Sequence, residues 1–522
     1  MNTLLNGMKN NTNYAYTENG ALTHKSTMSG LLDLFGMGAA YRTRSDEDCI
    51  VLFQKAYDED PVYALKCLFY LRDVRGGQGE RRFFRVICKW LAATHTESMR
   101  RNVKYVPEFG RWDDLYVFVS TKLENEAFTL MASQIALDLQ CKTPSLLAKW
   151  LKSENTSSAE SRALANKTRA AFDLNHRQYR KMLSYLRAKI NVVERLMSAG
   201  KWDEIEFDKI PSKAGLIYRN AFARHDIERM KSEKQVQTYE DFMKDDTTKV
   251  NAKALYPYEV VAKAYNYSRE HLTRNYNWST RRYEEPKGDL NDVERLAINK
   301  YWDNLKDYFN GCSLDALCVV DTSGSMTGSE ASAPINVAIS LGLYAAERAR
   351  GPFAGHYVSF SSRPQLIETA GVDFVDKVRR IYQTNLCENT NIVATFDMLL
   401  NTAIRNRCKQ SDLPKSIVVI SDMEFDAARG CHNYSYGRQS NSGHATLMEG
   451  IERKWRQAGY QMPNLVFWNV QARQDNIPMT VKDGISFVSG FSPVLFEQIM
   501  KGKTAFDLMM DKLNDKRYEV IK

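Results

Sequence analysis

Carboxylate and hydroxyl side chains gather directly after the apolar run LCVV at 317–320. Asp321, Ser323 and Ser325 alternate along one short loop, in the order D-x-S-x-S. Hard oxygen ligands with few charges suit Mg²⁺, or Mn²⁺ in its place, in octahedral geometry with retained waters. The motif alone also fits a plain turn and helix N-cap, so a metal site needs further ligands from elsewhere in the chain.

Two other segments offer such ligands. Ser421 and Asp422 follow the apolar run IVVI at 417–420, and Thr390 precedes a helical pattern, with Thr384 as a competitor in the same loop. Parallel strands end at one edge of a sheet, which is where such folds bind ligands. The predicted magnesium site consists of Asp321, Ser323, Ser325, Thr390 and Asp422. With only two carboxylates, the metal would stay electrophilic and could accept an outside acidic side chain or phosphate.

The pattern of residues 311–522 predicts the elements that would position these ligands. Strand-like runs occur in LDALCVV, AGHYVSFSS, SIVVISDMEF, NLVFWNVQAR and GISFVSG, and helical patterns lie between them. Alternating strands and helices of this length indicate a mostly parallel sheet covered on both faces. We therefore expect an α/β domain over this half of the chain.

These motifs support a resemblance to a known family. DTSGSM at 321–326, Thr390 and SDMEFD at 421–426 together resemble the metal-ion-dependent adhesion site of a von Willebrand factor A domain. The resemblance implies the open, Rossmann-like α/β fold of that family over 311–522. It also implies a docking role, in which a protein partner supplies an acidic residue to the bound cation.

The positive charge of the chain lies in its other half. The formal net charge of the 522 residues is +9, of which +8 falls within 1–310 and +1 within 311–522. A basic region beside a neutral one favours a polyanion as partner of the basic part. An excess of this size over 310 residues is also compatible with an ordinary solvated surface.

The most distinctive basic segment is LRDVRGGQGERRFFRVICKWL at 71–91. Arg81, Arg85 and Lys89 recur every four residues and form one stripe on a helix, opposite an apolar side. Backbone N–H groups of the glycine-rich turn before it could hold phosphates together with the neighbouring arginines. A solvated helix face is the alternative. Further basic-aromatic groups occur at 110–114, 176–181 and 213–225, and the candidate RNA contacts are Arg72, Arg75, Arg81, Arg82, Arg85, Lys89, Arg111, Arg177, Arg180 and Lys181.

Residues from about 30 to 300 show helical periodicity and no clear strand, which predicts a helical repeat domain, a HEAT-like α-solenoid. We expect an N-terminal arm at 1–30, the helical domain at 31–310 and the α/β domain at 311–522. In layout the chain resembles the TROVE-module Ro ribonucleoproteins, and short segments such as 17–35 are similar to an uncharacterised family that pairs the same two domain types. The resemblance implies a helical ring that binds noncoding or single-stranded RNA.

The sequence therefore predicts an RNA-binding ribonucleoprotein component whose A domain docks a partner through Mg²⁺. Two alternatives stay open, a protein-assembly scaffold without RNA and a metal-dependent nuclease. We expect no enzyme, because no nucleophile–base pair and no nucleotide-binding loop is found, and two-metal nucleases need more carboxylates. The apolar runs are only strand-sized and no signal peptide is visible, which predicts a cytoplasmic protein without a membrane span.

Overall fold

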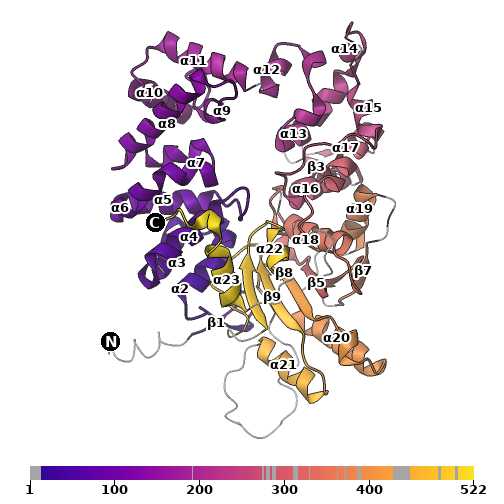
Figure 1. Ribbon diagram of the computed structural model, residues 1–522. Helices are drawn as coiled ribbons and strands as arrows, with labels where there is room; N and C mark the ends of the chain where they lie inside the picture. Colours follow the sequence, from indigo (N-terminus) through magenta and orange to yellow (C-terminus); the bar gives the residue numbers. More distant parts are fainter. Residues whose placement is uncertain are drawn as a thin grey trace. The chain divides into compact units, whose positions relative to one another are not determined.

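The computed structural model describes residues 13–190, 192–234, 236–272, 275–277, 282–284, 290–309, 315–328, 330–360, 363–369, 371, 373–384, 390–426, 447–479, 484–499 and 504–522. The chain forms two compact units (Figure 1). The first, which we call the sheet unit, comprises residues 1–45, 54–60 and 255–512. The second, the helical unit, comprises residues 46–53, 61–254 and 513–522.

A six-stranded mixed sheet forms the centre of the sheet unit, with strand order β10-β9-β8-β5-β6-β7. All neighbouring strands are parallel except the edge strand β7, which is antiparallel to β6. The strands are β5 (Ala316–Asp321), β6 (His356–Phe360), β7 (Leu366–Glu368), β8 (Ser416–Ser421), β9 (Asn464–Asn469) and β10 (Ile485–Ser489). Five of the six were predicted from the sequence, whereas β7 has only three residues and was not.

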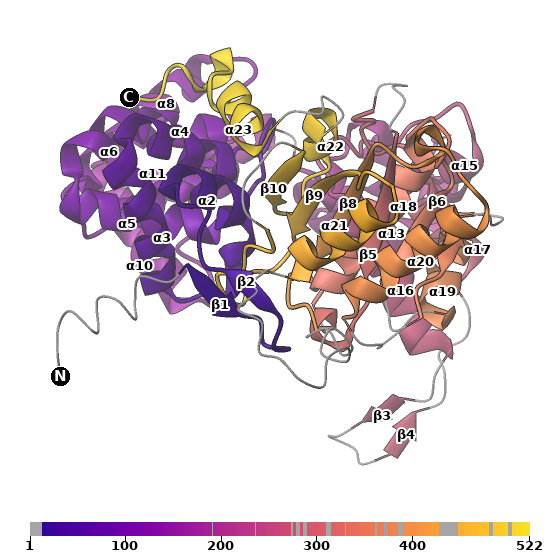
Figure 2. The ribbon, with the colours of Figure 1, turned by 90° about the horizontal axis from the view of Figure 1, so that it is seen from below.

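Helices cover this sheet on both faces, as its nearly continuous apolar strands require. The helix α18 (Pro334–Arg348) contacts β5, β6 and β8, and Figure 2 shows α20 (Ile392–Arg405) and α21 (Leu447–Gln457) on the opposite, near face. Gly342 of α18 permits the close approach to the sheet, because a Cβ there would lie 2.3 Å from Cγ2 of Val320. The sequence prediction of an α/β domain is thereby confirmed.

The remaining elements of the sheet unit come from the N-terminal segment and from residues 257–513. Two short hairpins, β1–β2 and β3–β4, are antiparallel. The second hairpin lies within the range predicted to be wholly helical, so that prediction was wrong there. These elements are β1 (Tyr14–Tyr16), β2 (Leu22–His24), α2 (Gly30–Met37), α16 (Pro257–Leu272), β3 (Asn275–Asn277), β4 (Arg282–Glu284), α17 (Asp292–Asp303), α19 (Phe374–Thr384), α22 (Val494–Ile499) and α23 (Ala505–Leu513).

The helical unit consists of helices and short 3-10 turns in its described residues. The helix α3 (Asp46–Glu59) contributes to both units. The others are α4 (Pro61–Arg72), α5 (Arg82–Thr94), α6 (Thr96–Asn102), α7 (Val106–Phe109), α8 (Glu124–Gln140), α9 (Leu147–Trp150), α10 (Ala159–Ala171), α11 (His176–Lys189), α12 (Val193–Ser198), α13 (Ser212–Arg224), α14 (Asp226–Met230) and α15 (Tyr239–Lys244). The helical character is confirmed, while the HEAT-like repeat stays a prediction.

The C-terminal residues return to the helical unit. Asp73, fully buried at the end of α4, accepts hydrogen bonds from the Arg517 guanidinium (Nη2–Oδ1 2.8 Å) and from the Tyr518 hydroxyl (3.1 Å). The Tyr518 ring stacks on Phe109 with 5.6 Å between the ring centroids. Residues 513–522 are therefore part of the core of this unit.

The domain boundaries predicted at 30/31 and 310/311 stay a prediction. Among the helices that the structure describes, none combines the length and the apolar composition that a bilayer-spanning segment needs.

Candidate metal centre and basic surfaces

The sheet positions the two predicted metal-binding loops. β5 and β8 are adjacent parallel strands, with Val320 paired to Ile420, so both chains leave the sheet at the same edge. Asp321 is the last residue of β5, and Asp422 directly follows Ser421, the last residue of β8. The two loops therefore meet, and a hydrogen bond joins Ser421 to Asp321, which lies 100 positions earlier in the sequence.

We call this group the strand-end cluster (Asp321, Ser323, Ser325, Ser421 and Asp422), and hydrogen bonds connect its members other than Asp422. The Ser421 hydroxyl donates to Asp321 Oδ2 (2.5 Å), and the Ser323 N–H donates to Asp321 Oδ1 (2.9 Å). The Ser323 and Ser325 hydroxyl oxygens are 3.0 Å apart. The structure therefore brings together four of the five predicted ligands.

Thr390 is the fifth predicted ligand. It is buried, and its carbonyl oxygen accepts a hydrogen bond from the Asp426 N–H (3.0 Å), which places its backbone against the loop after β8. No hydrogen bond joins its hydroxyl to the strand-end cluster among the described residues. The side chain of its competitor, Thr384, lies outside the described part of the chain.

The two carboxylates of the cluster are electrostatically strained. Burial, followed by the charge of Asp422, raises the pKa of Asp321 above its usual range. Burial likewise raises the pKa of Asp422. Both side chains are essentially inaccessible to water, with exposed fractions of 0% and 1%. A divalent cation between them would favour the ionised form of both groups.

One polar atom of the cluster has no hydrogen-bond partner in the described structure. Asp422 Oδ2 is buried and accepts no hydrogen bond, although buried carboxylate oxygens normally accept at least one. This orphaned oxygen, beside the Ser323 and Ser325 hydroxyls, matches the donor set that Mg²⁺ or Mn²⁺ prefers. No group of three or more His, Cys, Asp or Glu side chains suited to a metal occurs among the described residues, so a site here depends on hydroxyl ligands.

The loop after β8 contains two features that the sequence reading missed. Met423 adopts a φ of 66°, in the left-handed region that a bulky side chain rarely occupies, and its N–H donates to the Ser421 hydroxyl (3.0 Å). Glu424 is buried, and burial raises its pKa to about 7. The left-handed backbone conformation of Met423 costs of order 1–3 kcal/mol and is typical of functional loops.

The N-terminal segment also borders this loop, which no local sequence signal indicated. The Thr17 hydroxyl donates to the Phe425 carbonyl (2.7 Å), the Glu18 N–H donates to Glu424 Oε2 (2.6 Å), and the Asn19 amide donates to the Glu424 carbonyl (2.6 Å). Further along, the backbones of His24 and Ile477 exchange two hydrogen bonds. Contacts between such distant positions depend on the folded sheet unit.

In the helical unit, the arginines before and after the glycine-rich turn are held by two buried aspartates. Asp114 pairs with Arg72 (2.7 Å) and with Arg85 (2.7 Å), and Asp113 pairs with Arg85 (3.0 Å) and Arg111 (2.9 Å). Arg111 and Arg85 lower the pKa of Asp113 although burial acts to raise it. Arg72 is only 2% exposed, so the structure assigns it to the core and not to an RNA surface.

Arg81 belongs to the same arginine cluster (Arg72, Arg81, Arg85 and Arg111) but makes no ion pair within the described structure. It is exposed just before α5, and partial desolvation with the charges of Arg111 and Arg85 lowers its pKa. Four guanidinium groups around two carboxylates leave an excess of positive charge here. Of the remaining predicted contacts in this segment, Arg75 and Lys89 are exposed, and Arg82 pairs with Asp46.

The predicted phosphate cradle in the glycine-rich turn is not available. The N–H groups of Gly77 and Gly79 donate to the Asp73 carbonyl (3.2 and 3.1 Å), and that of Gln78 donates to the Tyr70 carbonyl (3.2 Å). These N–H groups therefore continue the hydrogen bonding of α4, and each already has an acceptor within the fold. The turn needs a glycine because a Cβ at Gly77 would lie 2.0 Å from the Tyr70 carbonyl oxygen.

A second basic surface lies on α11. Arg177, Arg180 and Lys181 are all exposed and occupy one side of the helix, opposite the buried Tyr179. Tyr185, which is 52% exposed and four residues beyond Lys181, adds an aromatic ring to that side. The sequence reading named the three basic residues and missed Tyr185, although its spacing was a usable signal.

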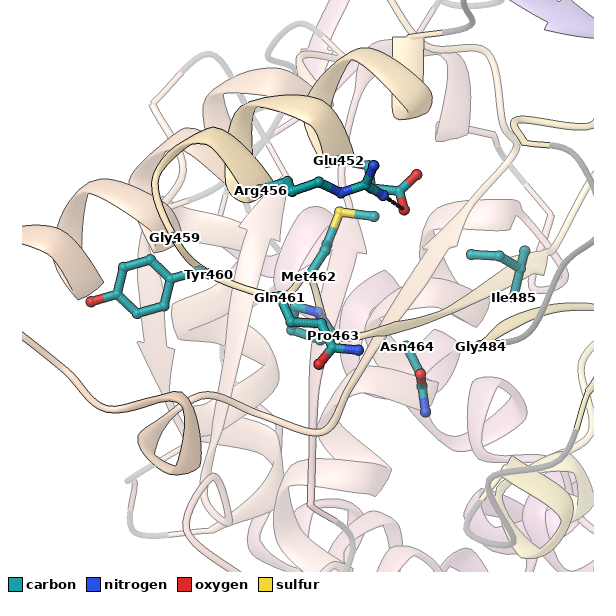
Figure 3. Close-up of a pocket in the computed structure, with 10 residues that line it drawn as sticks. All are labelled: Glu452, Arg456, Gly459, Tyr460, Gln461, Met462, Pro463, Asn464, Gly484 and Ile485. Atoms are coloured by element: carbon teal, nitrogen blue, oxygen red, sulfur yellow. Dashed lines mark hydrogen bonds and ion pairs between the residues drawn. The ribbon is translucent and has the colours of Figure 1, made fainter.

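A separate hollow lies in the sheet unit (Figure 3). Its volume is about 500 Å³, and Asn464 and Ile485, the first residues of β9 and β10, line it. The strand-end cluster sits at the opposite ends of the strands. The hollow is therefore distinct from the candidate metal centre.

Together these features define a protein with a helical unit that carries basic surfaces and an α/β unit with a polar cluster at its strand ends. The chain belongs to the family described as domain of unknown function DUF2828, whose profile matches residues 17–171 and 126–309. A second profile, domain of unknown function DUF7788, matches residues 315–520.

The full-length similarity extends to a viral protein. The "Uncharacterized protein L728" of Acanthamoeba polyphaga mimivirus is 29% identical over 530 residues, covering 94% of this chain and 85% of the viral one. Among solved structures, the Ro (RSR) protein of Deinococcus radiodurans aligns over 93% of this chain and 96% of its own, with 14% identity and a TM-score of 0.38. A score that low establishes no common fold.

Proposed function

We propose that this protein is a non-enzymatic RNA-binding component whose helical unit binds single-stranded or structured noncoding RNA. The observation that carries the proposal is the exposed basic side of α11, where Arg177, Arg180 and Lys181 stand beside the exposed ring of Tyr185. Cations neutralise phosphates, and an exposed ring can stack an unpaired base. The unpaired Arg81 adds a second basic position in the same unit.

We further propose that the strand-end cluster binds one Mg²⁺ or Mn²⁺, in the manner of the metal-ion-dependent adhesion site of a von Willebrand factor A domain. Asp321, Ser323, Ser325 and Asp422 would hold the ion, with Thr390 as an outer member. The orphaned Asp422 Oδ2 and the two hydroxyls support this assignment. When bound, the ion supplies a positive centre that accepts an acidic side chain of a protein partner.

The absence of catalysis is part of the proposal. The cluster offers two carboxylates and several hydroxyls, whereas two-metal nucleases use more converging carboxylates. Incubating the protein with Mg²⁺ and labelled RNA tests this directly. Cleavage that disappears in Asp321→Ala would establish the nuclease alternative instead.

The RNA proposal is tested with a fluorescently labelled RNA hairpin that has a single-stranded tail, by anisotropy over a series of salt concentrations. The triple variant Arg177→Gln, Arg180→Gln, Lys181→Gln should weaken binding at low salt. It should also reduce the log–log salt slope by about 2, since each single-strand phosphate contact contributes roughly −0.7. Replacing Tyr185 by Ala should weaken binding with little change of slope, because stacking releases few counterions.

A matched triple variant in the sheet unit removes the same charge. Arg405, Arg407 and Lys409 are exposed there and serve as the control when replaced by Gln. Equal losses in both triples would mean that only net charge matters. An intact protein that binds no RNA at low salt would favour the scaffold alternative, in which the helical unit grips a protein.

A further inference from the structure

One guanidinium group reaches the strand-end cluster from the segment after β9. Arg473 Nε lies 3.7 Å from Asp422 Oδ2, the oxygen without a hydrogen-bond partner, and Arg473 Nη2 donates to the Ser325 carbonyl. Arg473 Nη1 also lies 3.3 Å from Glu18 Oε2. A single cation thus contacts both loops of the proposed metal site and an acidic residue of the N-terminal segment.

The backbone on each side of this contact is fixed, so the contact is a property of the fold. The Arg473 carbonyl accepts a hydrogen bond from Arg44 Nη1 (2.6 Å), and the preceding Ala472 N–H donates to the Ala40 carbonyl (3.0 Å). The Glu18 N–H is anchored on Glu424. Only the two side chains, 32% and 41% exposed, retain freedom to move.

Arg473 and Asp422 are close enough for an ion pair but too far apart for a hydrogen bond. At 3.7 Å the two charges attract each other, but the separation exceeds that of a hydrogen bond. Asp422 Oδ2 is therefore oriented by a nearby charge without being saturated by it. A divalent cation at the same oxygen would repel the guanidinium, which already has the Glu18 carboxylate as a second ion-pair partner.

We propose that Arg473 competes with the divalent cation for Asp422, and that Glu18 holds the displaced guanidinium at the rim of the site. This inference rests on the proposed metal site and adds two positioning residues to it. A cation can then bind only if its attraction to Asp422 exceeds that of the Arg473 guanidinium. Through Glu18, the N-terminal segment takes part in this competition between the guanidinium and the cation.

The two residues should act in opposite directions. Arg473→Gln removes the competitor and should tighten Mn²⁺ binding by about fivefold or more, in the range of ordinary coupling between two ligands. Glu18→Gln removes the alternative acceptor of the guanidinium and should weaken Mn²⁺ binding by a similar factor. The double variant should match Arg473→Gln alone, because Glu18 acts through the arginine.

The experiment titrates chelator-treated, full-length protein with Mn²⁺ alone, at fixed ionic strength, and measures free Mn²⁺ by electron paramagnetic resonance. Arg456→Gln is the matched control, since Arg456 is 79% exposed in the same unit, and it should leave affinity unchanged. Asp321→Ala identifies the site. Circular dichroism confirms that each variant is folded, and Glu18→Gln, at an exposed side chain, remains informative even if the arginine variant unfolds.

The outcomes separate this inference from the metal site itself. If Asp321→Ala binds Mn²⁺ like the wild type, or if neither wild type nor Arg473→Gln binds, the metal site and the competition both fail. If Asp321→Ala loses binding but Arg473→Gln binds no more tightly than wild type, the site stands and the competition is wrong. If Glu18→Gln weakens binding equally with and without Arg473, Glu18 acts through its own charge and its assigned role is overturned.

Discussion

The strand-end cluster and the arginine cluster both concentrate charged side chains in a small buried volume. They differ in how far the carboxylates have ion-pair and hydrogen-bond partners. In the arginine cluster, Asp113 and Asp114 are each shared by two guanidinium groups. In the strand-end cluster, burial raises the pKa of both carboxylates, the charge of Asp422 adds to the shift of Asp321, and one oxygen of Asp422 has no hydrogen-bond partner. Unused hydrogen-bonding capacity, more than charge itself, distinguishes a candidate ligand site from a structural network.

The largest expected effect is the loss of a buried partner in the arginine cluster. Asp114→Ala leaves the buried guanidinium of Arg72 without its carboxylate, which should destabilise the helical unit by about 3–5 kcal/mol. Urea unfolding measures the change. Asp46→Ala breaks an ion pair in which the carboxylate is 61% exposed, and it should cost less than about 1 kcal/mol. Equal costs would show that the cluster is not a structural network.

The glycine-rich turn should behave as part of the same network. Gly77→Ala places a Cβ against the Tyr70 carbonyl oxygen, so the backbone must shift, and we expect a loss of about 2–3 kcal/mol. Gly200→Ala provides the contrast between a steric clash and an unfavourable backbone conformation. At Gly200 φ is +68°, but no atom lies within 4 Å of the added Cβ, so only the backbone conformation opposes the substitution. Loss of RNA binding by Gly77→Ala without loss of stability would instead restore the phosphate-cradle prediction.

The strand-end cluster should show a dependence on pH opposite in sign to that of the arginine cluster, where the pKa of Asp113 is lowered. Because burial raises the pKa values of Asp321, Asp422 and Glu424, the folded sheet unit holds protons that the unfolded chain releases. Its stability should therefore fall as the pH rises from about 4 through the raised values. Mg²⁺ binds the ionised carboxylates and should restore about 1.4 kcal/mol at ten times its Kd, mainly above pH 7.

Thermal unfolding between pH 5 and 8, with a chelator or with Mg²⁺, checks this prediction. The stabilisation by Mg²⁺ should be larger at pH 8 than at pH 5 and should vanish in Asp321→Ala. An equal effect of Mg²⁺ at both pH values would indicate that the ion binds elsewhere.

The smallest expected effect compares neighbouring arginines. Arg81 has no ion pair among the described residues, whereas Arg82 pairs with Asp46. Arg81→Gln should therefore reduce the salt slope of RNA binding by about 0.7, and Arg82→Gln by less. A larger effect at Arg82 would mean that its ion pair opens when RNA binds.

Local patterns predicted most of what depends on local order. The sequence predicted an apolar side opposite the basic stripe on this helix, and the apolar residues Phe84, Ile87, Cys88 and Leu91 are indeed all fully buried. The D-x-S-x-S loop and the two buried strands were readable for the same reason, since strand, loop and hydroxyl spacing are continuous in sequence. Neither the HEAT-like repeat nor the cation itself is decided by these patterns.

Local patterns could not predict which charged side chains pair with each other. Asp114, the partner of both Arg72 and Arg85, lies 42 positions after the first and 29 positions after the second. Arg473 and Glu18 are 455 positions apart. Which guanidinium meets which carboxylate depends on the packed fold, so the sequence identified the charged groups without their partners.

The return of residues 513–522 to the helical unit has a consequence for biosynthesis. A ribosome adds about 5–20 residues per second from the N-terminal end, so residues 61–254 emerge long before Arg517 and Tyr518. Until then the carboxylate of Asp73 lacks the guanidinium and the hydroxyl that hold it in the folded unit. The helical unit therefore acquires its last segment only after residues 255–512 of the sheet unit have been synthesised.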